Sequence, residues 1–558
     1  MAIVKVWIKS PREPEIDTNE PARSAPTRRT ILGGALPAAA GALAVVGVTA
    51  GQAQAAAPSP ASKSKSKFPA DLETATVAEL TVLLNSGRIT SVQLTQEYLR
   101  RIEALDVQGP ALNAVRCVNP GALKEAKEAD IRRKRGGHNS PLLGIPVLLK
   151  DNIDAVGMPT TAGSVALKDS RPDRDAPLVT LLRSAGAVIL GKANLTEFAN
   201  YLTNGMPGGF SSLGGQVLNA YDASQTPSGS SAGPGAAASV GLATLAIGTE
   251  TSGSILSPAA ANSDVGVKPT VGLISRTGIV PIAASQDTAG PLVRTVADAA
   301  ALLTVITGKD HEDQATAANP LVGHDFSKDL STTALQGARI GVVASQVPSA
   351  GTDNRTLWDA ALAVLVARGA TLVDVVLSTS SSIPGGSSVL TYEFKRDLNT
   401  YLARLPKNAP AKTLADIVAY NNANSGRALK FGQLLATASQ AVDLGSGSAD
   451  TAKYLADRAQ DLKDSKERID GLLADQDLTA LLFANSGSAG IGAKAGYPSV
   501  SVPAGYQAAN RRPFNIAFLG RAWSEPVLLG YAYDYEQASL LRRPPSVVNP
   551  SLFDSAAL

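Results

Sequence analysis

Three short, almost entirely apolar runs constrain the fold of this chain more than any other feature. They lie at residues 144–149, 187–190 and 242–247, and a glycine or a charged residue directly follows each of them. A strand that is buried on both faces of a sheet has such a continuous apolar run. Helical patterns lie between and around the runs, at residues 74–105, 176–184 and 290–308. This alternation predicts an α/β fold in which helices cover both faces of a sheet.

The rest of the 558-residue chain favours one large domain. A chain of this length allows one large domain or two to four ordinary ones. No proline-rich linker follows residue 70, which favours a single domain over residues 71–558. Residues 378–388 are rich in serine and glycine and indicate a surface connection. A more variable helical lobe is expected at about residues 375–475.

The N-terminal segment has the pattern of an export signal. Arg28 and Arg29 precede a weakly apolar, glycine-rich stretch, and small residues follow at 55–57. This order is typical of a secretory signal, and the paired arginines indicate the twin-arginine type. We therefore expect a signal at residues 1–57 cleaved near Ala55–Ala57, a flexible tether at 58–70, and a secreted protein that meets the twin-arginine export machinery. An uncleaved membrane anchor and a chance pair of arginines are the alternatives.

The scarcity of cysteine and histidine excludes several kinds of site. The single cysteine, Cys117, permits no disulfide within the chain, and it excludes cysteine-rich zinc sites and cysteine-ligated iron–sulfur clusters. The three histidines lack the spacing of metal ligands, so we expect neither a metal nor another cofactor. Lysine and arginine number 51 against 48 aspartates and glutamates, which gives no basic field for nucleic acid. Any catalysis must depend mainly on serines, lysines and carboxylates.

Residues 203–236 form a long stretch rich in glycine, serine and asparagine, and such a stretch inside a domain is usually functional. Within it, Gly229–Gly233 matches the nucleophile-elbow pattern of α/β-hydrolases, with Ser231 as the nucleophile. That mechanism needs a histidine late in the chain, and the last histidine is His324. The elbow interpretation is therefore rejected. A flexible glycine–serine turn remains the simple alternative for this stretch.

Two further positions fit a serine mechanism without histidine. Ser254 lies beyond the run 242–247, and the consecutive backbone amides before it suit an oxyanion hole. Lys150 directly follows the run 144–149. Burial there would lower the pKa of its amine and favour the neutral, basic form. A lysine that leaves the strand for the surface is the alternative.

Four segments together resemble the amidase signature family. They are residues 144–164, 229–269, 270–296 and 495–539, and the likeness extends over roughly 72–545. The resemblance implies an amidase-signature fold with a large mixed central sheet. It also implies an amidase that hydrolyses a carboxamide to a carboxylate plus ammonia or an amine. The partner would be a small-molecule or peptide amide, and the oligomeric state stays open.

The resemblance further implies a catalytic triad. Lys150 matches the family's base, Ser230 its bridging serine, and Ser254 its nucleophile. The bridging serine of the family follows a cis peptide bond, which here would join it to Gly229. Ser231 matches a neighbouring serine that supports the relay.

The same resemblance places the oxyanion hole in the turn before the nucleophile. The backbone amides of Thr251, Ser252, Gly253 and Ser254 match it. The departures from the family's usual residues leave the triad intact and lie in the loops around it. They are Ser228, Ala232, Pro234, Ser252 and Leu256.

Residues 285–291 and 391–402 look most like peptide amidases, which release ammonia from C-terminal peptide amides. We expect Tyr392 to Leu402 and the helices at 410–435 to shape the substrate pocket, with a place in the helix core as the alternative for Tyr392 and Phe394. Two other functions stay open: an A-type subunit of a tRNA-dependent amidotransferase, and a non-catalytic binding protein on the amidase scaffold. The predicted signal disfavours the first, and the retained triad residues disfavour the second.

Overall fold

The described part of the protein begins beyond the predicted signal. The computed structural model describes residues 68–137 and 140–554. The signal and anchor alternatives for 1–57 and most of the tether predicted at 58–70 therefore lie outside the described residues. Within the described ranges, no helix has the length and apolar character that a membrane span requires.

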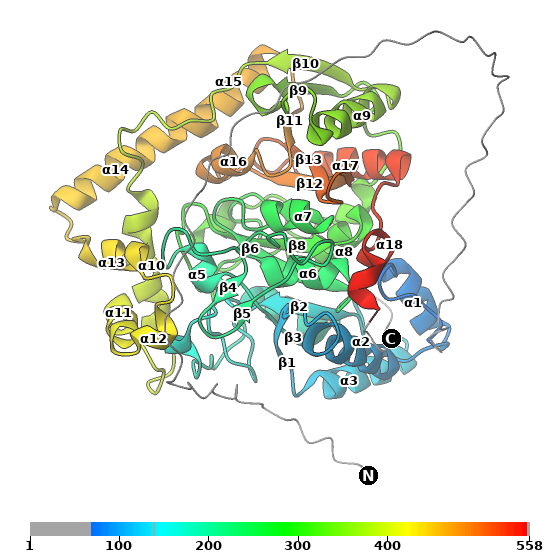
Figure 1. The fold of residues 1–558 in the computed structure, drawn as a ribbon, viewed down its shortest axis with the longest axis horizontal. Coiled ribbons are helices and arrows are strands. Elements are labelled where there is room, and N and C mark those ends of the chain that lie inside the picture. Colours follow the sequence, from blue (N-terminus) through cyan, green and yellow to red (C-terminus); the bar gives the residue numbers. More distant parts are fainter. Residues whose placement is uncertain (1–67, 138–139, 555–558) are drawn as a thin grey trace, which may run out of the picture. The chain divides into compact units, whose positions relative to one another are not determined.

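One mixed sheet forms the centre of the fold (Figure 1). Within the described residues it has eleven strands in the order β1-β3-β2-β6-β8-β7-β12-β13-β11-β9-β10. The strands are β1 (Val115–Val118), β2 (Pro146–Lys150), β3 (Val188–Ala193), β6 (Leu245–Glu250), β7 (Val265–Lys268), β8 (Thr288–Val293), β9 (Arg339–Val343), β10 (Thr371–Val375), β11 (Ala480–Ala484), β12 (Ser499–Tyr506) and β13 (Pro513–Leu519). A separate two-stranded ribbon joins β4 (Phe210–Ser211) to β5 (Gly215–Gln216).

The three apolar runs form neighbouring strands at the centre of this sheet. β2 pairs in parallel with both β3 and β6, whereas β6 pairs antiparallel with β8. Every residue of β2, β3 and β6 is buried, as strands covered on both faces require. Because β2 and β6 are parallel, their last residues, Lys150 and Glu250, lie toward the same edge of the sheet. The expected large mixed sheet is confirmed.

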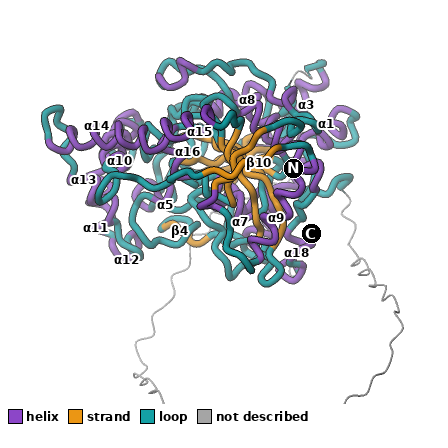
Figure 2. Tube along the Cα trace, turned by 90° about the horizontal axis from the view of Figure 1, so that it is seen from above, coloured by secondary structure: helices purple, strands orange, loops and turns teal. Residues whose placement is uncertain are grey.

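Helices flank the strands on both sides, and Figure 2 shows the strands enclosed between them. α1 and α2 each begin at a capping box, in which a threonine side chain and the helix's third residue satisfy each other's backbone amides. The helices around the sheet are α1 (Val77–Asn85), α2 (Ser91–Arg101), α3 (Ala122–Lys134), α4 (Pro177–Ala185), α5 (Glu197–Asn200), α6 (Ala232–Ser239), α7 (Leu256–Asn262), α8 (Val296–Ile306), α9 (Asp353–Ala367), α16 (Ala489–Ala495), α17 (Glu525–Ser539) and α18 (Pro545–Val548).

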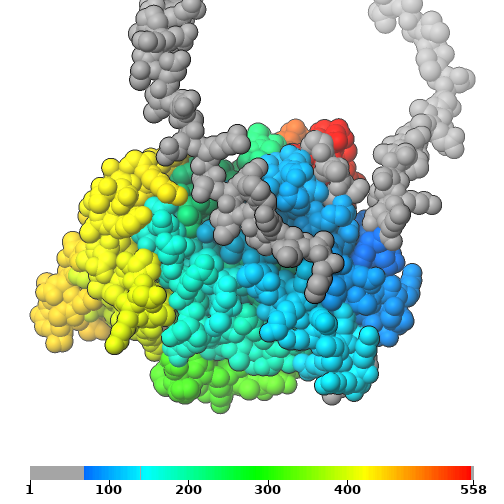
Figure 3. Space-filling model, turned by 90° about the horizontal axis from the view of Figure 1, so that it is seen from below, coloured from blue at the N-terminus to red at the C-terminus, as the bar shows by residue number. Residues whose placement is uncertain are grey.

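The expected helical lobe forms at one side of the sheet. It comprises α10 (Val389–Arg404), α11 (Leu414–Ala423), α12 (Ser425–Ala428), α13 (Leu434–Ala441), α14 (Ala449–Leu462), a π-helical turn (Lys463–Glu467) and α15 (Arg468–Asp475). Phe394 of α10 packs edge-on against Phe198 and Tyr201. Figure 3 shows the yellow surface of the lobe beside cyan and teal surface from earlier parts of the chain. An apolar cluster therefore joins the lobe to the chain that follows β3.

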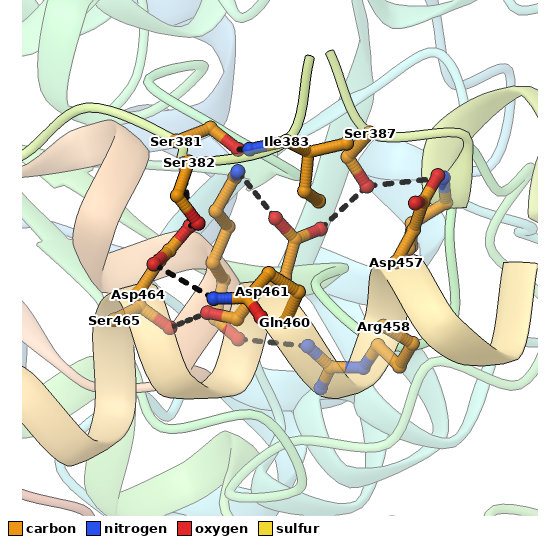
Figure 4. A network of polar contacts seen from close by, with 12 residues as sticks. Ser381, Ser382, Ile383, Ser387, Asp457, Arg458, Gln460, Asp461, Asp464 and Ser465 are labelled. Carbon is orange, nitrogen blue, oxygen red and sulfur yellow. Dashed lines mark hydrogen bonds and ion pairs between the residues drawn. The ribbon is translucent and has the colours of Figure 1, made fainter.

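A row of aspartates fixes the serine-rich connection that leads into α10 (Figure 4). Asp457, Asp461 and Asp464 lie on one helical face. The Ser387 hydroxyl donates to Asp461 over 2.6 Å. The Ser382 amide and hydroxyl both donate to Asp464 over 2.7 Å. Residues 378–388 are therefore a surface connection, as predicted, and the side chains of α14 and the π-helical turn hold them in place.

Candidate active site

Lys150 lies at the end of β2, and its side chain is fully buried. Its Nζ lies 2.8 Å from Ser230 Oγ, 2.9 Å from Thr249 Oγ1 and 3.2 Å from Thr249 O. A neutral amine has two N–H donors and one lone pair. It can therefore donate to both Thr249 oxygens while it accepts the proton of the Ser230 hydroxyl. Lys150 is buried as the sequence predicts, and the alternative of a surface lysine is wrong.

The surroundings of Lys150 favour its neutral form. Burial lowers the pKa of the amine from 10.5 to about 7, because the charged form loses hydration. The negative charges of Asp287 and Glu250 act in the opposite direction and raise it. At neutral pH a large fraction of Lys150 is therefore an unprotonated base.

The loop before α6 brings Ser230 to the lysine. The peptide bond between Gly229 and Ser230 is cis, as the resemblance implies. The Ser230 carbonyl accepts a hydrogen bond from the Thr196 amide over 3.0 Å. A Cβ at Gly229 would lie 2.4 Å from Thr196 Oγ1, so this position has no room for a side chain. The simple alternative of a flexible turn does not describe this loop, whose Ser230 side chain is fully buried.

Ser231 connects the two serine-bearing loops. Its hydroxyl donates to the Thr249 carbonyl over 3.0 Å and accepts from the Thr249 amide over 3.2 Å. Its own amide donates to the Ser254 carbonyl over 3.2 Å. The hydroxyl is thus engaged with backbone groups, which suits a supporting residue and not a nucleophile.

Glu250 organises the turn that carries Ser254. Its carboxylate accepts hydrogen bonds from the amides of Gly253 and Ile255 over 2.7 Å and of Leu256 over 3.0 Å. Glu250 is itself buried, so these charge-assisted bonds hold the turn against the end of β6. Sequence reasoning missed this residue. A glutamate that directly precedes a serine- and glycine-rich turn could have indicated it.

The geometry corrects one expectation about the oxyanion hole. The Gly253 amide donates to Glu250, so it is not a free donor. Among the described residues, the amides of Thr251, Ser252 and Ser254 have no acceptor within the protein. The Ser254 side chain is almost buried, and its hydroxyl likewise has no hydrogen-bond partner within residues 68–137 and 140–554. The turn therefore presents three amides and one hydroxyl to a bound molecule.

Asp287 lies behind the same turn. It accepts a short hydrogen bond from the Thr251 hydroxyl and two bonds of 2.9 Å from the amides of Ile282 and Ala283. Burial raises the pKa of Asp287 to about 7, although these hydrogen bonds lower it. Asp287 belongs to the segment 285–291, which looks like peptide amidases, but the sequence did not indicate that it contacts the turn.

A cavity of about 220 Å³ opens beside this arrangement. Its lining includes Asn152, Thr249, Thr251 and Asp287, and Asn152 donates to Thr249 Oγ1 over 3.0 Å. Residues of α10 also line it, namely Asp397, Thr400, Tyr401 and Arg404. The cavity thus adjoins both the partner of Lys150 and the turn that bears Ser254.

The lobe contributes less to the cavity than the sequence predicts. Part of the segment 392–402 lines it, but Tyr392 and Phe394 are buried in the lobe, which fits the core alternative. No residue of 410–435 lines the cavity, so that expectation is wrong. The reason is geometric, because α11 and α13 pack against α10 and against each other, and α11 also packs against the short helical turn Val165–Leu167. Within the described residues, no cluster of three or more histidines, cysteines or carboxylates could hold a metal ion.

Comparison with known proteins identifies the family of the chain. The family described as Amidase matches residues 93–489, which is most of the chain. The chain belongs to the amidase family. It is therefore an amidohydrolase, which cleaves the C–N bond of carboxamides.

This amidase resembles several characterised or named relatives. A solved peptide amidase from Stenotrophomonas maltophilia is 44% identical, with a TM-score of 0.79, over 84% of this chain and 98% of that one. A probable amidase of Arabidopsis thaliana is 39% identical over 86% of this chain and 92% of its own length. The A-type subunit of glutamyl-tRNA(Gln) amidotransferase from Halorhodospira halophila is 34% identical, over 83% of this chain and 97% of its own length.

Proposed function

We propose that this amidase hydrolyses C-terminal peptide amides through an acyl-enzyme on Ser254. The hydrogen bond of 2.8 Å between buried Lys150 and Ser230 carries the proposal, because it supplies a base to a serine in a chain without a suitable histidine. The similarity to a solved peptide amidase supports the choice of substrate class.

In the acylation step, Ser254 Oγ attacks the amide carbon. The Ser254 proton passes to Ser230 Oγ while the Ser230 proton passes to the neutral amine of Lys150. The carbonyl oxygen becomes an oxyanion, which the free amides of Thr251, Ser252 and Ser254 are placed to stabilise. When the C–N bond breaks, the same relay returns the proton to the leaving nitrogen, so that ammonia departs instead of an amide anion.

In the deacylation step, water replaces Ser254 as the nucleophile. Lys150 accepts the water proton through Ser230, and the hydroxide equivalent attacks the ester carbon. Collapse of the second oxyanion breaks the bond to Ser254 Oγ, which regains its proton. The products are the free carboxylate of the peptide and the regenerated enzyme.

Ammonia release tests the proposal directly. Purified protein is mixed with a simple amide, a dipeptide amide and glutamine, and ammonia is measured for the wild type, Ser254→Ala and Lys150→Ala. Each variant should lose at least about 10³-fold in rate, whereas a chelator should change nothing. Ser257→Ala, on α7 just beyond the turn, is the matched control and should keep normal turnover. Retained turnover in Ser254→Ala would refute the mechanism.

The amidotransferase similarity supplies the second candidate function. A chain that served in such an amidotransferase would deliver ammonia from glutamine and would depend on partner subunits. Rapid hydrolysis of dipeptide amides by the isolated chain, with slow use of glutamine, would favour the peptide amidase. The opposite preference would favour the amidotransferase role.

Export is a separate part of the proposal. The order of residues 1–57, with Arg28 and Arg29 before the glycine-rich stretch, supports transport by the twin-arginine machinery and cleavage near Ala55–Ala57. Replacing both arginines by lysine should stop export in a cell that has this pathway. Continued secretion of the double variant would refute the twin-arginine assignment.

A further inference from the structure

The cavity beside Ser254 has more acidic than basic residues in its wall. Its arginines are Arg174, Arg276 and Arg404, and its acids are Asp154, Asp173, Asp287, Glu312, Asp313 and Asp397. Each arginine already has a carboxylate partner. Arg174 and Arg404 contact Glu312 at 2.7 and 3.4 Å, and Arg276 contacts Asp313 at 2.6 Å. The wall therefore offers no unpaired positive charge to a substrate.

Two buried acids of the cavity wall, Asp154 and Asp287, have no cation within ion-pair distance among the described residues. Asp287 accepts three hydrogen bonds, from the Thr251 hydroxyl and from the amides of Ile282 and Ala283. Asp154 is 5% exposed and accepts one hydrogen bond of 2.8 Å, from the hydroxyl of Tyr401. Lys192 and Arg174 lie near enough to lower the pKa of Asp154, but their ion pairs are with Asp151 at 3.2 Å and with Glu312 at 2.7 Å. Burial raises the pKa of Asp154 to about 6, so its carboxyl remains largely ionised at neutral pH. A buried carboxylate without a cation is unfavourable, and a cationic ligand would relieve it.

Its position in the chain places Asp154 close to the reacting groups. It follows Lys150 by four residues, so the two Cα atoms are at most about 14 Å apart. Asn152, between them, contacts Thr249, which in turn contacts Lys150. Asp154 and Thr251, which belongs to the turn that bears Ser254, line the same small cavity. A substrate whose last residues fill this cavity therefore places them beside Asp154.

This inference rests on the proposed function and narrows its substrate class. We infer that Asp154 makes the cavity select amides that carry a positive charge within about two residues of the scissile bond. Such a charge is either a lysine or arginine side chain or the ammonium group of a short peptide. Asp154 is thus a specificity residue that contacts the substrate and takes no part in the proton relay.

Three matched amides test the inference. Nα-acetyl-lysinamide carries a side-chain charge, alanyl-norleucinamide carries an N-terminal charge, and Nα-acetyl-norleucinamide carries none. For the wild type, kcat/KM for at least one charged amide should exceed that of the neutral one by roughly tenfold or more. Asp154→Asn keeps an acceptor for Tyr401 and should abolish the preference for the charged amides. Asp154→Glu should retain it.

Two controls separate the possible failures. Asp173→Asn removes an exposed carboxylate at the rim of the cavity, where solvent screens charge, and should leave the ratio unchanged. Binding of the same amides to Ser254→Ala by calorimetry reports the charge preference without turnover. If no amide is hydrolysed but the charged ones bind more tightly, the proposed function fails and the inference stands. The inference would be overturned if charged and neutral amides had equal kcat/KM and equal affinity. It would also be overturned if Asp154→Asn kept the wild-type ratio of kcat/KM between charged and neutral amides.

Discussion

Replacing Lys150 by methionine should make the folded protein more stable at neutral pH while it removes activity. Burial lowers the pKa of this amine from 10.5 to about 7, which corresponds to about 5 kcal/mol at 1.36 kcal/mol per pH unit. Below pH 7 the shifted pKa lowers the free energy of unfolding of the wild type by this amount. The reason is that protonation of Lys150 stabilises the unfolded chain more than the folded one. Methionine gives up three hydrogen bonds to Ser230 and Thr249, worth about 1 kcal/mol each. The net advantage of the variant is therefore about 2 kcal/mol.

The sign of the pH dependence follows from proton binding. Between pH 7 and 10.5, the pKa values of the folded and unfolded amine, the unfolded chain holds a proton on Lys150 that the folded chain lacks. The stability of the wild type should therefore rise with pH, relative to the variant, by about 1.4 kcal/mol per pH unit in this window. Below pH 7 the difference should be constant, and the order of the two proteins should reverse at about pH 8.

Urea denaturation of both proteins from pH 6 to pH 10 provides the measurement. The quantity of interest is the difference between the two unfolding free energies, which removes the contribution of groups common to both. In parallel, kcat/KM of the wild type should rise with pH around a midpoint of about 7, because the neutral amine is the active form. Two results together would refute the assignment of Lys150 as a buried neutral base. They are a difference in unfolding free energy that does not vary with pH and a kcat/KM that does not rise around pH 7.

Three further changes should have distinct effects. Glu250→Gln loosens the turn that presents the oxyanion amides, so kcat should fall by roughly 10²–10³ with little change in KM. Loss of its negative charge should also shift the midpoint of the activity profile near pH 7 to lower pH, and an unshifted midpoint would contradict its electrostatic effect on Lys150. Ser231→Ala removes the acceptor of the Thr249 amide and one donor to the Thr249 carbonyl, and it should lower the free energy of unfolding by about 1–3 kcal/mol, as thermal or urea denaturation would show. Asp464→Ala removes the hydrogen bonds to Ser382 and should speed limited proteolysis within residues 378–388 without changing the rate of amide hydrolysis. Cleavage at the wild-type rate would contradict the role of Asp464 in holding this connection in place.

The sequence predicts those features that local patterns determine. Continuous apolar runs predict β2, β3 and β6, and the position of Lys150 after one run predicts its burial. Motifs shared with the amidase family indicate Ser230 and Ser254, because those motifs keep their order along the chain. These predictions need no knowledge of long-range contacts.

Other features depend on contacts between distant segments, and the sequence did not reveal them. The Glu250 carboxylate accepts a hydrogen bond from the Gly253 amide only because the turn folds back on the end of β6. Tyr401 reaches Asp154 across 247 positions of the chain, so neither residue signals the contact locally. For the same reason, helical periodicity at 410–435 predicts helices correctly but does not say which of them face the cavity.

The identity of the acylated residue is the most direct test of the central claim. The enzyme is mixed with a slowly hydrolysed amide or ester, quenched early and digested, and the modified side chain is located by fragmentation mass spectrometry. We expect the acyl mass on Ser254, and we expect it to be absent from Ser254→Ala under the same conditions. An acyl group on Ser230, Ser231 or Ser252, or turnover without any acylated serine, would contradict the proposed mechanism.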